Sequence, residues 1–106
     1  MPFYRKMSEA RRSHPLTILF NDRRFLRIEI DPHYEKKHPD MTDQIILELV
    51  RLLDGQGSER VTESDGFFYC ARELYWRGKP YRIVLTYGDE DFLGVINAFR
   101  VKEKKV

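Results

Sequence analysis

One stretch decides the fold of this chain: residues 66–101, GFFYCARELYWRGKPYRIVLTYGDEDFLGVINAFRV. It contains three runs rich in aromatic and β-branched residues, which favour strands. Residues 77–80 and 88–91 separate the runs and hold the Gly, Pro and Asp residues that are typical of turns. Because connections this short cannot cross a sheet face, neighbouring runs must be antiparallel. The stretch therefore predicts a three-stranded antiparallel meander.

Alternation of side chains in the first run places one charged residue, Arg72, on an otherwise apolar face. A hairpin centred on Gly78 and Lys79 would set Arg72 opposite Leu85 of the second run. We therefore expect an arginine that points toward the apolar side of the sheet. The apolar residues on its face are Phe68, Cys70, Leu74 and Trp76.

A second polar residue, Asn97, interrupts the third run. Whether it shares a face with Arg72 depends on how many residues the 88–91 loop uses, because a slip of one residue turns every side chain to the other face. The sequence leaves both arrangements open. Alternation groups Asn97 with Leu93, Val95, Phe99 and Val101.

The first half of the chain predicts a hairpin and one helix. Residues 16–20 and 25–30 read as strands around a turn at 21–24, and the second has Leu26, Ile28 and Ile30 on its apolar face. Asp40 is the expected N-cap of a helix of about 13 residues, and Gly55 is the expected stop. The predicted fold is α+β: an antiparallel sheet, made of the hairpin and the meander, with one main helix packed on one face.

Length and composition indicate one ordered domain. The chain has 106 residues, of which 42% are hydrophobic and 34% charged. We expect a basic arm at residues 1–13, the domain at 14–102 and a basic tail at 103–106. Net charge is only +2, yet residues 31–65 are acidic and both flanking parts are basic. This asymmetry permits a basic surface for a polyanion, although solvated charge explains it equally well.

The sequence predicts a cytoplasmic protein without metal or cofactor. A single cysteine, Cys70, lies in a strand pattern and is expected to be a buried thiol. No signal peptide or membrane span is visible in the sequence, and none of the common phosphate, metal or nucleophile motifs occurs. His33 and His38 are five positions apart, which is not the spacing that puts two imidazoles on one helical face.

Several polar residues on or beside the sheet fit metal-independent RNA cleavage, in which a 2′-hydroxyl attacks its own phosphate. The candidate catalytic residues are His33, Arg72, Arg82 and Asn97, because histidine transfers protons near neutral pH and arginine stabilises phosphate charge. The candidate RNA-binding residues are Tyr81, Arg100 and Lys102. A purely structural role is the alternative for each of these residues. Arg72, for example, would pair with an acid, and Asn97 would form a hydrogen bond with a carbonyl at the sheet edge.

A histidine-bearing segment before a helix, then the strands RGKPYRIVLTY and VINAFRVKEKK, resembles the small toxins of the RelE, ParE and BrnT kind. These belong to the wider barnase, EndoU, colicin and RelE grouping. The resemblance implies a helix on a curved antiparallel sheet, ribonuclease activity without metal, and a cognate antitoxin as partner. Carried over by position, it assigns roles to His33 (or His38), Arg82 and Asn97. RelE-type toxins usually open with helices, whereas this chain opens with a predicted hairpin.

Two alternatives belong to other functional classes. A non-catalytic protein-binding module, such as an immunity or regulatory partner or a homodimer, would use an exposed aromatic patch. A binder of single-stranded nucleic acid would stack bases on aromatic rings beside Arg82 and Arg100, without cleavage. The patch expected for the first alternative contains Tyr69, Tyr75, Trp76 and Tyr87.

Overall fold

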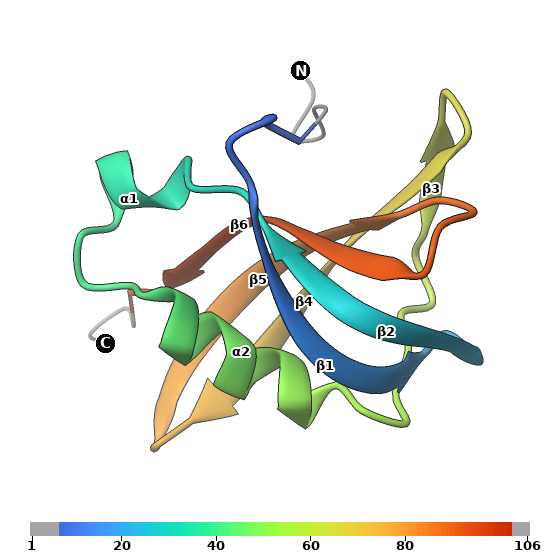
Figure 1. Ribbon diagram of the computed structural model, residues 1–106. Coiled ribbons are helices and arrows are strands. Elements are labelled where there is room, and N and C mark those ends of the chain that lie inside the picture. The colour runs from blue at the N-terminus through green and yellow to red at the C-terminus, as the bar shows by residue number, and fades with distance from the viewer. Residues whose placement is uncertain (1–6, 103–106) are drawn as a thin grey trace.

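The computed structural model describes residues 7–102, which form a six-stranded sheet and two helices (Figure 1). The elements are β1 (Arg12–Phe20), β2 (Arg23–Ile30), α1 (Tyr34–Lys37), α2 (Asp43–Leu52), β3 (Thr62–Ser64), β4 (Phe67–Trp76), β5 (Lys79–Tyr87) and β6 (Phe92–Arg100). The predicted α+β class is confirmed, and the predicted hairpin and meander both form.

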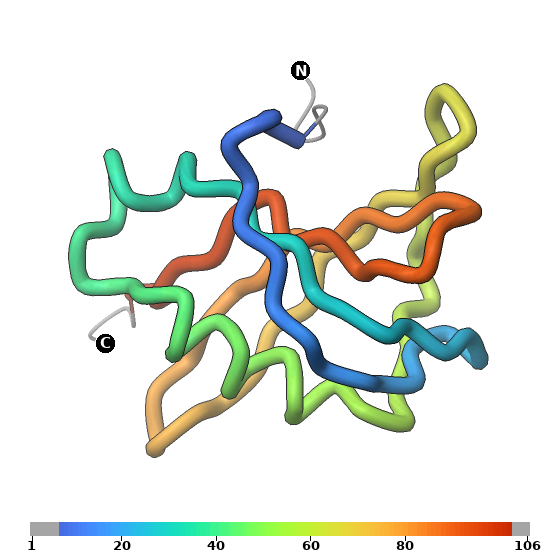
Figure 2. Tube along the Cα trace, viewed as in Figure 1, coloured from blue at the N-terminus to red at the C-terminus, as the bar shows by residue number. Residues whose placement is uncertain are grey.

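The sheet is mixed, so the prediction of a purely antiparallel sheet is wrong. The strand order is β1-β2-β6-β5-β4-β3, and β6 pairs with β2 in parallel. Figure 2 shows β6, in red, between β2 and β5. Since both helices and the strands β3, β4 and β5 separate β2 from β6 in sequence, the connection is long enough for a parallel return. The sixth strand is the short β3, which pairs with the start of β4.

The β4–β5 hairpin turns at Arg77 and Gly78, one position before the expected centre. Both residues have positive φ, 53° and 77°, as a two-residue turn of this kind requires, and glycine tolerates the second position. Arg72 therefore lies opposite Ile83 instead of Leu85. Because this shift amounts to two residues, Arg72 keeps its predicted place on the face of the main core.

A bulge in β6 decides where Asn97 points. Val95 pairs with Leu85, whereas Asn97 pairs with the preceding residue, Val84, so that Ile96 is extra. Val84 belongs to a small apolar cluster separate from the main core, and Asn97 shares its face. Asn97 and Arg72 are therefore on opposite faces of the sheet.

The bulge also overturns the predicted grouping of the third run. Leu93 and Val95 lie in the main core before it, but after it Ala98 enters the core and Phe99 does not. Strict alternation fails here because the extra residue reverses the facing of every later side chain.

Helix α2 covers one face of the sheet (Figure 1). Its N-cap is Thr42, not Asp40, because the Thr42 hydroxyl accepts a hydrogen bond of 3.1 Å from the Ile45 N–H. Ile46 and Leu49 are buried on its apolar face. Gly55 follows the helix with a φ of 82°, as its predicted role as a stop requires. The short helix α1 was not expected from the sequence.

The N-terminal hairpin is longer than expected, and some of its side chains point to the opposite face from the one predicted. β1 begins at Arg12 instead of residue 16, and the turn at Asn21 and Asp22 has positive φ at both positions. Phe25 is buried, whereas Leu26, expected in the apolar face, is 51% exposed. The β1–β2 register shifts just opposite these two residues, which changes the alternation.

Aromatic side chains fill both faces, and the predicted exposed aromatic patch is wrong. Tyr69 and Tyr87 are buried, and Trp76 packs against the main core. Of the four, Tyr75 alone is exposed, at 74%. Within the expected arm, Ser8 donates its backbone N–H to Asp31 and Arg11 donates to Glu29 of β2, while Arg12 and Ser13 already belong to β1. Residues 1–6 of the arm and the tail at 103–106 lie outside the described residues.

Candidate functional site

Two of the predicted catalytic residues share the outer face, meaning the face of the sheet that is turned away from the main core. Arg82 lies opposite Phe99, and Val84, two residues further along β5, lies opposite Asn97. Residues two apart on a strand point the same way, so Arg82 and Asn97 belong to one surface.

A histidine joins this surface, and it is His38, the second of the two histidines that the resemblance allowed. Its ring stacks on Phe99, with centroids 5.0 Å apart and the planes inclined by 20°. His33 is instead the N-cap of α1, and its backbone N–H donates to Asp31 Oδ1 at 2.9 Å. We call His38, Arg82, Asn97 and Phe99 the outer site.

Arg72 lies on the opposite face and does not contribute to the outer site. Its guanidinium donates to Gln56 Oε1 at 2.7 Å and to the Gly57 carbonyl, which ties the loop after α2 to the sheet. The expected pairing of Arg72 with an acid is therefore wrong: its partners are a loop amide and a loop carbonyl. Cys70, on the same face of β4, is a buried free thiol. Its burial raises the pKa of the thiol to about 11, as expected of an unreactive cysteine.

The three predicted RNA-binding residues do not form one surface. Tyr81 is buried, and its ring and the ring of Trp76 pack edge-to-face with centroids 5.8 Å apart. Arg100 is exposed directly opposite Tyr81, so it lies on the face of the main core at the end of β6. Lys102 is exposed just beyond the strand.

The outer site is flanked by positive charge. Helix α1 lies beside β6 and carries the exposed Lys36 and Lys37 in its last turn, immediately before His38 (Figure 1). Within residues 7–102, the exposed Arg82 side chain makes no hydrogen bond or ion pair, although Glu73 is its cross-strand neighbour. An unpaired guanidinium is free to bind an external anion.

A second polar cluster, which the sequence did not indicate, surrounds Asp43 at the start of α2. Arg12 donates to both carboxylate oxygens, at 2.7 and 2.8 Å. The Tyr34 hydroxyl donates at 2.6 Å, and His14 Nε2 lies 2.9 Å from Oδ2. These residues come from three separate segments, so no local spacing in the sequence could have grouped them.

The contacts in this cluster shift three pKa values. The Arg12 guanidinium, assisted by Tyr34 and His14, holds the pKa of Asp43 well below its ordinary value. Burial, together with the bond to Asp43, raises the pKa of Tyr34 to about 12. The bond to Asp43 raises the pKa of Arg12. Each charge is thus stabilised by a partner within the cluster.

The charge balance of the Asp43 cluster disfavours a phosphate ligand. Arg12 is shared between two carboxylates, Asp43 and the more distant Glu35 at 3.3 Å. Arg12, Asp43 and Glu35 together carry a net negative charge. The cluster therefore fits a structural clamp that joins β1 to α2, whereas the outer site has the charge and the free donor that a polyanion needs.

Within residues 7–102, no three His, Cys, Asp or Glu side chains are grouped so as to hold a metal ion. No helix in the described part of the chain is long and apolar enough to cross a membrane. Comparison with protein-family models, curated proteins and solved structures finds no match to this chain.

Proposed function

We propose that this protein acts on single-stranded RNA at the outer site and cleaves it without a metal ion, as the resemblance to RelE-like toxins implies. One observation supports this more than any other. Arg82, which has no partner in the described part of the chain, lies opposite Phe99, and the Phe99 ring stacks on His38. A cation, an aromatic ring and a proton carrier thus meet on one exposed surface.

Each residue has a chemical role in this proposal. His38 takes the proton of the 2′-hydroxyl, whose oxygen then attacks the adjacent phosphorus while the 5′-oxygen leaves with a proton from solvent. Arg82 stabilises the charge that develops on the phosphate oxygens. Asn97 Oδ1 accepts the Ala98 N–H at 3.0 Å, which leaves its Nδ2 donors available to the phosphate or the ribose.

The test is an RNA cleavage assay in the presence of a metal chelator, using single-stranded RNA. We expect cleavage by the wild type, and a loss of about a hundredfold or more in Arg82→Ala and His38→Ala, because each removes one catalytic contribution. Arg24→Ala is the matched control, since Arg24 is an exposed arginine on β2, away from the outer site. Intact RNA at every protein concentration would exclude the nuclease.

An inactive relative that binds RNA without cutting it is a distinct outcome. In that case RNA binding should weaken as salt concentration rises, since each phosphate contact releases counterions. Arg82→Ala should reduce that salt dependence. The proposal also includes toxicity and a cognate antitoxin that would neutralise it. Induction of the wild-type chain alone in bacteria should arrest growth, and induction of Arg82→Ala should not.

A non-catalytic protein-binding module is the second candidate, and an open strand edge favours it. β3 pairs with only the first three residues of β4, and no other strand in residues 7–102 pairs with that side of β4. The exposed Tyr75 lies on this open part. A strand from a partner or from a second copy can add to such an edge. A monomer in light scattering, with no partner retained from a native lysate, would remove this candidate.

A further inference from the structure

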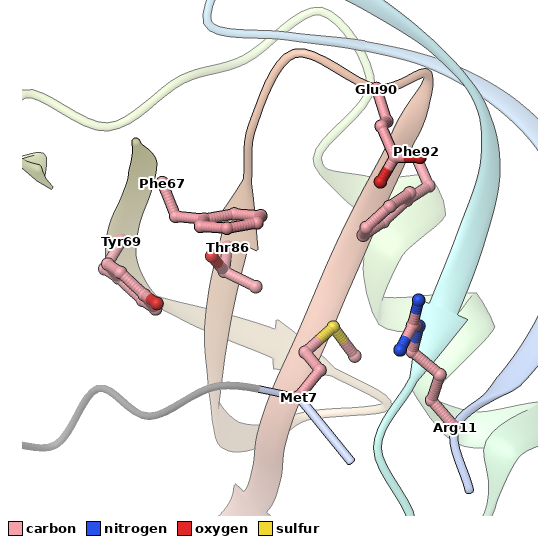
Figure 3. A pocket seen from close by; sticks show the side chains of 7 residues that line it. All are labelled: Met7, Arg11, Phe67, Tyr69, Thr86, Glu90 and Phe92. Atoms are coloured by element: carbon pink, nitrogen blue, oxygen red, sulfur yellow. The ribbon is translucent and has the colours of Figure 1, made fainter. Parts of the chain in front are cut away.

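The outer face contains a pocket around Thr86 (Figure 3). Thr86 lies near the end of β5, four residues beyond Arg82. The volume of the pocket is about 250 Å³, slightly below the range of about 300–1,000 Å³ that is usual for drug-sized ligands. A single planar group is therefore an appropriate size. The residues that line the pocket include Met7, Arg11, Phe67, Thr86, Glu90 and Phe92.

One lining residue carries an unsatisfied polar group. Thr86 is 97% buried, and its hydroxyl oxygen has no hydrogen-bond partner among the described residues. Leaving such a group unpaired is unfavourable, and native proteins do so rarely. Figure 3 shows the hydroxyl beside the Phe67 ring and the methyl group toward Met7. A rotation of about 120° about χ1 moves the hydroxyl into the present position of the methyl group, toward the pocket, and the methyl group moves to the position of Hβ.

The other walls restrict the ligand to a neutral aromatic group. Phe67 and Phe92 lie on opposite sides of the cavity (Figure 3), which suits a flat ring system between them. Arg11 and Glu90 carry opposite charges, and Arg11 is already paired with Glu29 at 2.8 Å, so neither sign of ligand charge is favoured. A purely apolar ligand would leave the Thr86 hydroxyl unpaired.

We propose that this pocket binds one base of the single-stranded RNA whose backbone lies at the outer site. The identification of the ligand as RNA rests on the function proposed above. Thr86 and Arg82 lie four residues apart on the same face of β5, which corresponds to about 13 Å. A stacked strand covers that distance with about four nucleotides. The base stacks on the phenylalanine rings, and its edge forms a hydrogen bond with Thr86.

The experiment measures binding of adenosine, cytidine, guanosine and uridine to the full chain by NMR titration, separately from RNA cleavage. We expect at least one nucleoside to bind, and Thr86→Val to weaken that binding about three- to tenfold, because it removes one hydrogen bond and keeps the shape. Thr86→Ser retains the hydroxyl and should retain binding. Thr17→Val, a threonine change at an exposed position of β1, is the control and should have no effect.

The folding of the variants is checked by thermal unfolding, where Thr86→Val should be at least as stable as the wild type since it removes an unpaired buried hydroxyl. The inference is overturned if no nucleoside binds, or if one binds equally well to Thr86→Val. Failure of RNA cleavage and of RNA binding, with nucleosides still bound through Thr86, would reject the proposed function and leave the base pocket standing.

Discussion

The carboxylate of Asp43, the first residue of α2, accepts two hydrogen bonds from the guanidinium of Arg12, the first residue of β1, 31 positions earlier in the chain. This two-point contact fixes one end of the edge strand to the start of the helix. Tyr34, from α1, donates to the same carboxylate at 2.6 Å. One side chain therefore connects β1, α1 and α2.

Asp43→Asn should destabilise the protein by about 2 kcal/mol at neutral pH, because hydrogen bonds to a charged group are stronger than those to a neutral one. Urea unfolding of the variant and the wild type measures the difference. Asp40→Asn is the control, since Asp40 is exposed and makes no hydrogen bond within residues 7–102. Equal midpoints for Asp43→Asn and the wild type would show that the contact contributes nothing.

The stabilising effect of Asp43 should disappear in acid. Its pKa is held below the ordinary 3.8, chiefly by the hydrogen bonds from Arg12. A lowered pKa contributes stability that is complete above the unfolded-state value and is lost as pH falls through it and toward the folded-state value. The difference between wild type and Asp43→Asn should therefore be constant above about pH 5 and shrink below it. A difference that grows in acid contradicts this assignment.

Tyr34 should limit stability in alkali. Its pKa rises from 10.0 to about 12 through burial and the bond to Asp43, so its contribution is complete below pH 10 and is lost as pH rises toward 12. Tyr34→Phe should remove one component near pH 12 from the absorbance titration of tyrosinate. It should also cost about 1 kcal/mol at neutral pH, through the lost hydrogen bond. An unchanged titration would place the perturbed tyrosine elsewhere.

Gly78→Ala should destabilise the protein by about 1 kcal/mol, because alanine disfavours the left-handed backbone that the β4–β5 turn requires. A Cβ at Gly78, where φ is 77°, would meet nothing within 4 Å, so the effect is one of backbone conformation alone. Arg77→Gly is the companion variant: it relieves the positive φ of Arg77 but loses the contact of that guanidinium with Trp76, at 4.6 Å. Its unfolding free energy should change little.

Gly94→Ala should displace Met7 from the outer face. A Cβ at Gly94 would clash with the Met7 sulfur and come 2.9 Å from Thr86 Cγ2. Met7→Ala removes the first conflict, so a double-mutant cycle should reveal coupling between positions 7 and 94. Thermal unfolding of the two single variants and the double variant measures it. Strictly additive effects would mean that Met7 does not pack on Gly94 in solution.

The meander could be predicted from sequence because its strands are consecutive and their turns are local. Alternation placed Arg72 on the face of the main core, and the structure confirms that face. The same rule failed for Asn97 and Phe99, since the bulge at Ile96 adds one residue to β6. Nothing in the residues 92–100 marks the bulge, which lies just after the last pair between β2 and β6.

The candidate site, too, could be predicted only in part. Arg82 and Asn97 were predicted from their strands, and their shared face follows from pairing in the meander. His38 rather than His33 reaches this surface, where it stacks on Phe99, because α1, a single short helix with little sequence signal, lies beside β6. The Asp43 cluster was missed because Arg12, Tyr34 and Asp43 lie far apart in sequence.

The sequence by itself determined the α+β class, the hairpin, the meander and the amphipathic helix, because turn residues and hydrophobic periodicity act over a few neighbouring positions. Only the tertiary structure decided the parallel pairing of β2 with β6, the bulge, the burial of Tyr69 and the clamp at Asp43. Each of these depends on contacts between segments distant in the chain. Such contacts form only where the whole fold brings the segments together, so local sequence patterns do not predict them.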